Sequence, residues 1–131
     1  MIKFQQMPKL KNKKVLIIDD EPELIESVRM RLEANGYNVI AAADGDEGVA
    51  KAKIECPDLI LLDLIMPRVD GLKALSILKK DDRTKLIPVV ILTAKSEDEY
   101  ILDAGRLGAV DYLVKPVNMQ TLIEVVGRNI I

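Results

Sequence analysis

The chain has 131 residues, of which 49% are apolar, and its formal net charge is −2. This length suits one domain with a single packed core, and the apolar fraction argues against a disordered chain. No apolar run approaches the roughly 20 residues needed to cross a bilayer, and the lack of histidine excludes histidine-based acid–base catalysis and histidine metal ligands. The single cysteine, Cys56, cannot form a disulfide within the chain.

The charge is unevenly distributed along the chain. Residues 1–14 hold five lysines and no acidic residue, whereas the remaining 14 basic and 21 acidic residues give the rest a charge of −7. We interpret residues 1–12 as a solvated basic leader and residues 13–131 as one domain. The acidic body argues against direct binding of nucleic acid. Without a membrane span, a secretory signal or a disulfide, the chain is expected in the cytoplasm.

Five short runs rich in β-branched residues and leucine predict strands that are buried on both faces. In chain order these runs are Val15–Ile18, Tyr37–Ala42, Leu59–Leu62, Pro88–Leu92 and Asp111–Val114.

Helices are predicted after each of these strands. The first is expected to follow Asp20, which forms a capping-box pattern with Glu23 and precedes a proline in the first turn. It is expected to end at Asn35-Gly36, where the backbone can adopt a positive φ. The other helices are expected over 44–54 and 71–80, from the cap Ser96 to about Leu107, and from the cap Asn118 nearly to the C-terminus.

This (βα)5 alternation predicts an α/β fold with a doubly wound parallel sheet covered by helices on both faces. The expected architecture is a flavodoxin-like three-layer sandwich with the strand order 2-1-3-4-5. Folds of this kind place their ligands at the carboxyl ends of the strands, where the strand order reverses.

Polar residues directly follow four of the five predicted strands. Asp19 and Asp20 follow the first strand, Asp63 the third, Thr93 the fourth and Lys115 the fifth. In the order 2-1-3-4-5 these four strands are adjacent, so their polar residues are expected to meet at one edge of the sheet. This coincidence is more specific than any one of the residues.

Three carboxylates at one edge repel one another unless a cation lies between them. Mg2+ suits such a site because it prefers oxygen ligands and is commonly held by one or two carboxylates together with phosphate oxygens. A carboxylate can also act as a nucleophile toward phosphorus. Phosphoryl transfer needs mainly positioning and charge neutralisation, which a metal ion, a lysine and a hydroxyl group can supply.

With these residues in place, the chain resembles the receiver domain of response regulators in two-component signalling, over about residues 13–130. The resemblance is carried by the motifs Asp19-Asp20-Glu21, Asp63-Leu64-Ile65-Met66-Pro67 followed by Asp70-Gly71, Thr93-Ala94 and Lys115-Pro116. Each motif alone is weak, but their order and spacing together make a specific match.

The resemblance implies that Asp63 is the phosphoacceptor, which takes a phosphoryl group from a sensor histidine kinase or a histidine phosphotransfer protein. It also implies Mg2+ as the cofactor, with Asp19, Asp20, Asp63 and the backbone carbonyl of Ile65 as its ligands. Such a domain promotes only its own phosphorylation and dephosphorylation, and it is not otherwise an enzyme.

The resemblance further assigns a switch. Lys115 would pair with the phosphoryl group, and the Lys115–Pro116 peptide bond would be cis. Thr93 would move toward the phosphoryl oxygen, and Tyr112 would turn inward into the space left behind. The face formed by the fourth helix, the fifth strand and the fifth helix would then signal to an effector protein or a C-terminal effector domain, and it could support a weak homodimer.

Three other functions compete with this one. A phosphatase of the haloacid-dehalogenase type would have an aspartate two residues after the nucleophile, where this chain has Ile65. A flavodoxin-like cofactor binder would need a phosphate loop in place of Asp19-Asp20-Glu21. A pseudo-receiver, which is never phosphorylated and acts as a protein–protein interaction module, stays open as the alternative. The choice between a single-domain regulator and part of a larger regulator also stays open.

Overall fold

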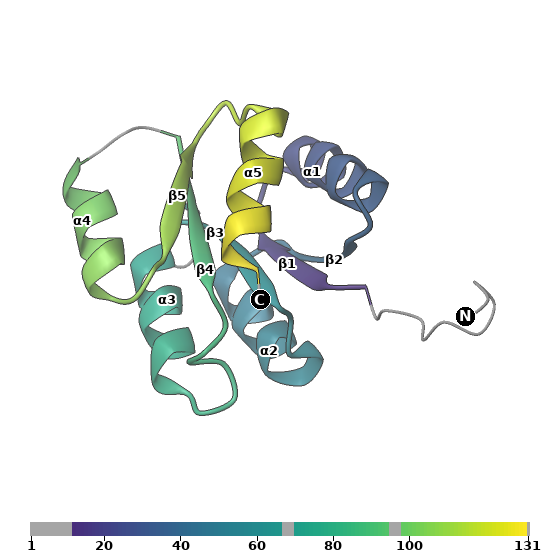
Figure 1. The fold of residues 1–131 in the computed structure, drawn as a ribbon. Coiled ribbons are helices and arrows are strands. Elements are labelled where there is room, and N and C mark those ends of the chain that lie inside the picture. The colour runs from purple at the N-terminus through teal and green to yellow at the C-terminus, as the bar shows by residue number, and fades with distance from the viewer. Residues whose placement is uncertain (1–11, 67–69, 95–97, 131) are drawn as a thin grey trace.

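The computed structural model describes residues 12–66, 70–94 and 98–130. Its centre is a parallel sheet of five strands in the order β2-β1-β3-β4-β5 (Figure 1). The strands are β1 (Lys14–Ile18), β2 (Asn38–Ala42), β3 (Leu59–Asp63), β4 (Val89–Thr93) and β5 (Asp111–Val114). The helices are α1 (Pro22–Ala34), α2 (Gly45–Glu55), α3 (Gly71–Lys80), α4 (Asp98–Arg106) and α5 (Met119–Asn129). The predicted fold class and strand order are therefore confirmed.

The helices form a layer on each face of the sheet, with α1 and α5 on one face and α2, α3 and α4 on the other (Figure 1). Alternate residues of each strand point to opposite faces, so Leu16 and Ile18 of β1 pack with α2 and α3, whereas Val15 and Ile17 pack with α1 and α5. Burial on both faces explains why the central strands are almost entirely apolar.

Most predicted boundaries agree with the structure to within one or two residues. β2 begins at Asn38, and β3 and β4 each extend one residue further than expected, to include Asp63 and Thr93. Asn118 caps α5, as predicted, by accepting a hydrogen bond from Thr121 N. The predicted cap Ser96 and most of the predicted leader lie outside the described residues.

The prediction that Asp20 caps α1 is wrong. The N-cap is Glu21, whose side chain makes no capping hydrogen bond. Asp19 orders this turn instead, because its Oδ1 accepts a hydrogen bond from Glu21 N at 2.9 Å. Pro22 begins the helix and has no N–H to satisfy. The exposed Asp20 carboxylate therefore lies at the sheet edge without a capping role.

The outer edge of β2 is covered by side chains from the helices on both faces of the sheet. The backbone groups of Asn38 and Ala42 form hydrogen bonds on the side that faces β1. The carbonyls of Val39 and Ala41, which alternate with them, therefore point outward. Val39 O accepts a hydrogen bond from Arg29 Nη1 of α1 at 2.9 Å, and Ala41 O accepts one from the Lys51 ammonium of α2.

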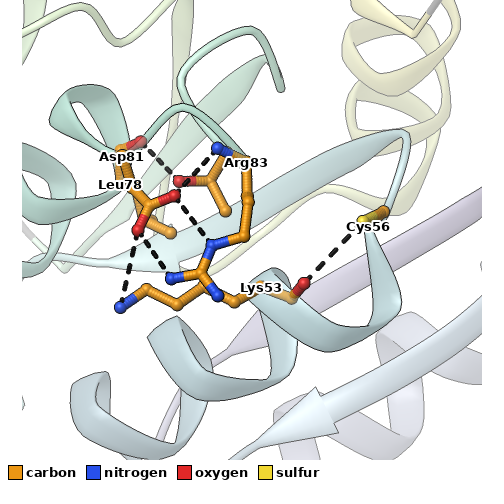
Figure 2. A network of polar contacts seen from close by, with 6 residues as sticks. Lys53, Cys56, Leu78, Asp81 and Arg83 are labelled. Carbon is orange, nitrogen blue, oxygen red and sulfur yellow. Dashed lines mark hydrogen bonds and ion pairs between the residues drawn. The ribbon is translucent and has the colours of Figure 1, made fainter.

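A polar network joins α2 to the segment after α3 (Figure 2). Both carboxylate oxygens of Asp81 accept hydrogen bonds from the Arg83 guanidinium, at 3.1 and 3.0 Å, and Lys53 Nζ lies 3.7 Å from Asp81 Oδ2. The Arg83 guanidinium holds the pKa of Asp81 well below its usual range. Thr84 Oγ1 donates to Leu78 O at 2.6 Å, which satisfies a carbonyl in the last turn of α3. The C-terminal end of α3 is thereby held in place.

Cys56 ends α2 in the left-handed region, with φ 46° and ψ 60°. A side chain costs about 1–2 kcal/mol in this conformation, whereas glycine adopts it freely. Cys56→Gly is therefore expected to raise the free energy of unfolding by about 0.5 kcal/mol, since a more flexible unfolded chain offsets part of the gain. Cys56→Val should lower it by about 1 kcal/mol, because a β-branched residue is strained at positive φ. Urea denaturation measures both, and equal stability of the two variants would contradict this account.

Candidate functional site

The candidate site lies at the carboxyl edge of the sheet, where β1, β3, β4 and β5 end side by side. Each of these strands is paired in register with its neighbour. The residues that the sequence singled out therefore come from neighbouring strand ends. The structure brings Asp19, Asp63 and Lys115 into direct contact.

The ammonium group of Lys115 lies at the centre of three carboxylates. Lys115 Nζ is 2.8 Å from Asp19 Oδ2, 3.0 Å from Glu21 Oε1 and 3.1 Å from Asp63 Oδ2. Burial alone would lower the pKa of Lys115, but the contacts with Asp19 and Glu21 outweigh it and hold that pKa above its ordinary value. The lysine is therefore a permanent cation over the whole physiological pH range.

Asp63 is a nearly buried carboxylate, with 3% of its surface exposed. Its Oδ1 accepts a hydrogen bond from Ile65 N at 3.0 Å, and its Oδ2 faces Lys115. Burial raises the pKa of Asp63, the Ile65 N–H lowers it and the neighbouring Asp19 charge raises it again, so that it lies above its usual value. Loss of solvent thus outweighs the stabilisation supplied by Lys115, and Asp63 is a carboxylate that gains from any further positive charge.

Asp19 is fully buried, and only one of its oxygens is hydrogen-bonded. Oδ2 has no hydrogen-bond partner among the residues that the structure describes, although it forms the 2.8 Å ion pair with Lys115. A buried oxygen in this state is costly unless a cation lies beside it. The oxygens of Asp19, Asp20 and Glu21 lie within 4.8 Å of one another. An all-oxygen donor set of this kind fits Mg2+.

Glu21 is the site residue whose role the sequence reasoning missed. It stands next to Asp20 in the same acidic run, which was the available signal, but its contact with Lys115 depends on how the chain turns into α1. Its side chain is more than half exposed, so it contributes less to the site's electrostatics than Asp19 does.

The backbone just after β3 pairs with the backbone just before α3. An isolated antiparallel bridge pairs Ile65 with Asp70, and Gly71 N donates to Leu64 O at 3.0 Å. Asp70 then caps α3 by accepting a hydrogen bond from Leu72 N. The backbone of Ile65, which the resemblance names as a ligand, is thereby held at the rim of the site.

The remaining predicted residues lie on β4 and β5 or directly after β5. Thr93 is buried at the end of β4, and its carbonyl accepts a hydrogen bond from Lys115 N at 2.6 Å. The Lys115–Pro116 peptide bond is cis. Tyr112 is 46% exposed and lines a cavity of about 250 Å³ that also contacts Ile91 and Ile101. A cavity therefore exists between α4 and β5 beside this tyrosine.

Comparison with known proteins agrees with this geometry. The family model of the response regulator receiver domain matches residues 15–127. The protein PilH of Pseudomonas aeruginosa is 40% identical over 114 residues, which are 87% of this chain and 94% of PilH. The chemotaxis protein CheY4 of Vibrio cholerae has a structure that superposes with a TM-score of 0.87 at 32% identity, covering 92% of this chain and all of CheY4.

Longer relatives match over only part of their length. The alkaline phosphatase synthesis transcriptional regulatory protein PhoP of Bacillus subtilis is 41% identical over 105 residues, which are 80% of this chain but 43% of PhoP. The chain thus spans less than half of that transcriptional regulator and nearly all of PilH. From the family match and these relatives together, we conclude that the chain belongs to the response regulator receiver domain family and is a receiver of two-component signalling.

Proposed function

We propose that this receiver is a phosphoacceptor switch in which Asp63 takes a phosphoryl group from a histidine kinase or a histidine phosphotransfer protein. The observation that carries the proposal is the contact of the permanent Lys115 cation with Oδ2 of the nearly buried Asp63 carboxylate. A carboxylate placed in this way is available as a nucleophile. After transfer, the lysine ammonium group can interact with the negatively charged phosphoryl oxygens.

In the proposed step, a carboxylate oxygen of Asp63 attacks the phosphorus of a phosphohistidine. The new O–P bond forms as the P–N bond to the donor imidazole breaks, and the imidazole keeps the electron pair and takes up a proton. The product is an aspartyl phosphate. Lys115 neutralises charge on the transferred group, and the Thr93 hydroxyl is proposed to contact one of its oxygens.

We propose Mg2+ as the cofactor of this step. Asp19, Asp20, Asp63 and the carbonyl of Ile65 would hold it, and the clustered carboxylate oxygens of the Asp19-Asp20-Glu21 run support this assignment. When bound, the ion would supply positive charge to the phosphoryl oxygens.

The output is proposed to run through the face formed by α4, β5 and α5. Thr93 would move toward the phosphoryl group and Tyr112 would turn inward, which changes the surface beside the cavity that Tyr112 lines. The partners proposed for this face are a downstream effector protein or a C-terminal effector domain, and the same face could form a weak homodimer.

We propose a cytoplasmic protein that binds no nucleic acid directly. In the part of the chain that the structure describes, no helix combines the length and the apolar character that crossing a membrane requires.

The test is intact mass spectrometry after incubation with Mg2+ and acetyl phosphate. The wild-type protein is expected to gain the mass of one phosphoryl group, and Asp63→Asn should gain none because the amide is not a nucleophile toward phosphorus. Chelation of Mg2+ should reduce the gain by at least tenfold. Asp63→Asn should stay folded, since it removes a carboxylate that burial disfavours. A folded wild-type protein that gains no mass would favour the pseudo-receiver instead.

A further inference from the structure

We propose that Gly71 is a positioning residue for the phosphoacceptor, because its missing side chain lets the first turn of α3 rest directly on the backbone of Asp63 and Leu64. This inference rests on the proposed phosphorylation of Asp63 for its kinetic test and on the structure alone for its geometry. Gly71 is buried at the point where the loop after β3 enters α3.

The contact involves backbone atoms that cannot move aside as a side chain would. A Cβ placed on Gly71 would lie 2.4 Å from Leu64 Cα, 2.7 Å from Asp63 O and 2.7 Å from Leu64 O. Ordinary contact begins near 3.4 Å, so one methyl group would force a displacement of roughly 1 Å between α3 and the Asp63–Leu64 peptide.

The conformation of Gly71 does not require glycine. Among the glycines that the structure describes, a positive φ is found at Gly36 and Gly108 but not at Gly71. Alanine is also the residue most favoured within helices. The need for glycine at position 71 therefore comes from the closeness of the phosphoacceptor's backbone, which makes the residue informative about the site.

Both sides of the contact are anchored in the fold. Leu75 and Leu78 of α3 are fully buried in the core, and the network around Asp81 holds the far end of the helix. On the other side, Leu64 N donates to Leu92 O at 3.2 Å. The displacement would therefore fall on the residues between these anchors, among them Ile65 and Asp70.

Ile65 and Asp70 carry the contacts that orient Asp63. Ile65 N donates to Asp63 Oδ1, and Ile65 is bridged to Asp70, the residue before Gly71. A shift here changes the direction of the Asp63 carboxylate relative to Lys115, and a misplacement of about 1 Å can reduce a reaction rate by about 100-fold.

The experiment compares Gly71→Ala with Gly36→Ala. Gly36 is the control because it tolerates alanine poorly for another reason, its φ of +89°, while an added Cβ there would meet no atom within 4 Å. Gly36 lies between α1 and the amino end of β2, whereas Asp63 is the last residue of β3, at the carboxyl edge of the sheet. Both variants are made in a Gly127→Ala background, where the added methyl meets no atom within 4 Å and should stabilise α5, so that both remain folded.

Two readouts separate positioning from general destabilisation. The first is the rate of phosphorylation by acetyl phosphate at saturating Mg2+, which should fall 10- to 100-fold in Gly71→Ala and less than threefold in Gly36→Ala. The second is the amide chemical shift of Ile65 without phosphodonor, which should move in Gly71→Ala alone. A folded Gly71→Ala protein with an unchanged Ile65 amide would overturn the proposal, as would equal rate losses in both variants. If the wild type is not phosphorylated at all, the proposed function fails, and the amide shift still decides the role of Gly71.

Discussion

Lys115→Met is expected to lower the free energy of unfolding by about 2–3 kcal/mol at pH 7, although methionine fills similar space. The variant leaves Asp19 and Asp63 buried together without the ammonium group that lies between them. Removing one partner of a buried ion pair is far more costly than replacing the whole pair by apolar residues, because it leaves an uncompensated buried charge. Lys80→Met, at an exposed lysine of α3, is the matched control and should cost less than about 0.5 kcal/mol.

The loss should depend on pH in a defined direction. The folded-state pKa of Asp63 is already raised by burial, and removal of a neighbouring cation can only raise it further. A carboxyl group whose pKa is raised on folding destabilises the folded state at pH values above its unfolded pKa of about 3.9, because it must then ionise in an unfavourable place. The difference between wild type and Lys115→Met should therefore be largest near pH 7 and shrink as the pH falls toward 4. Lys115 itself stays charged across this window, since its pKa is raised.

Mg2+ provides a second test of whether the variant is destabilised by the loss of positive charge between the carboxylates. Millimolar Mg2+ should stabilise Lys115→Met more than wild type, because binding to the folded state alone adds stability and the site then has no competing ammonium group. Thermal unfolding with and without Mg2+, between pH 4 and pH 8, measures both effects. A loss that is the same at every pH and unchanged by Mg2+ would show that Lys115 acts through packing alone.

Gly48→Ala is expected to destabilise the protein by about 1–2 kcal/mol, although alanine is the better helix former. A Cβ on Gly48 of α2 would lie 2.4 Å from Ile18 Cδ1, 2.6 Å from its Cγ1 and 2.9 Å from its Cγ2. Ile18 is fully buried in β1, so its side chain is surrounded by other core atoms. Overpacking of this kind costs about 1–3 kcal/mol, which exceeds the gain of up to about 1 kcal/mol in helix propensity. Gly127→Ala, with open space around its Cβ, should instead be stabilising.

A double-mutant cycle identifies the clash. Ile18→Ala alone should cost about 2–5 kcal/mol through the cavity that it leaves. Combining it with Gly48→Ala should cost less than the two single changes together, by about 1–2 kcal/mol, because all three crowded atoms are gone. Chemical denaturation of the four proteins gives the coupling energy. Additive effects would mean that Gly48 is required for some reason other than closeness to Ile18.

Much of the fold could be predicted because strands and helices here depend on local signals. Runs such as Leu59–Leu62 are short, apolar and preceded by a proline, which favours strands buried on both faces, and Asn118 is an effective cap wherever a helix follows it. The convergence of Asp19, Asp63 and Lys115 followed from the strand order, since residues that end adjacent parallel strands must lie at one edge.

Features that depend on competing side chains could not be predicted. Asp20 and Asp19 both suit the turn into α1, and only the folded backbone shows that Asp19 takes the hydrogen bond from Glu21 N. The ion pair between Glu21 and Lys115 joins residues 94 positions apart and follows from that same turn. The steric demand at Gly71 is equally non-local, because it depends on a contact with Leu64 that the spacing alone does not reveal.

The covered edge of β2 limits how copies of this protein could assemble. A fibre built by continuing the sheet from one molecule to the next needs two open edges in every copy, one to receive a strand and one to offer a strand. Because Arg29 and Lys51 occupy the outward carbonyls of Val39 and Ala41, a strand from another copy would have to displace both side chains in order to pair with β2. Growth of the sheet on the β2 side is thereby disfavoured, which works against open-ended polymerisation through this edge.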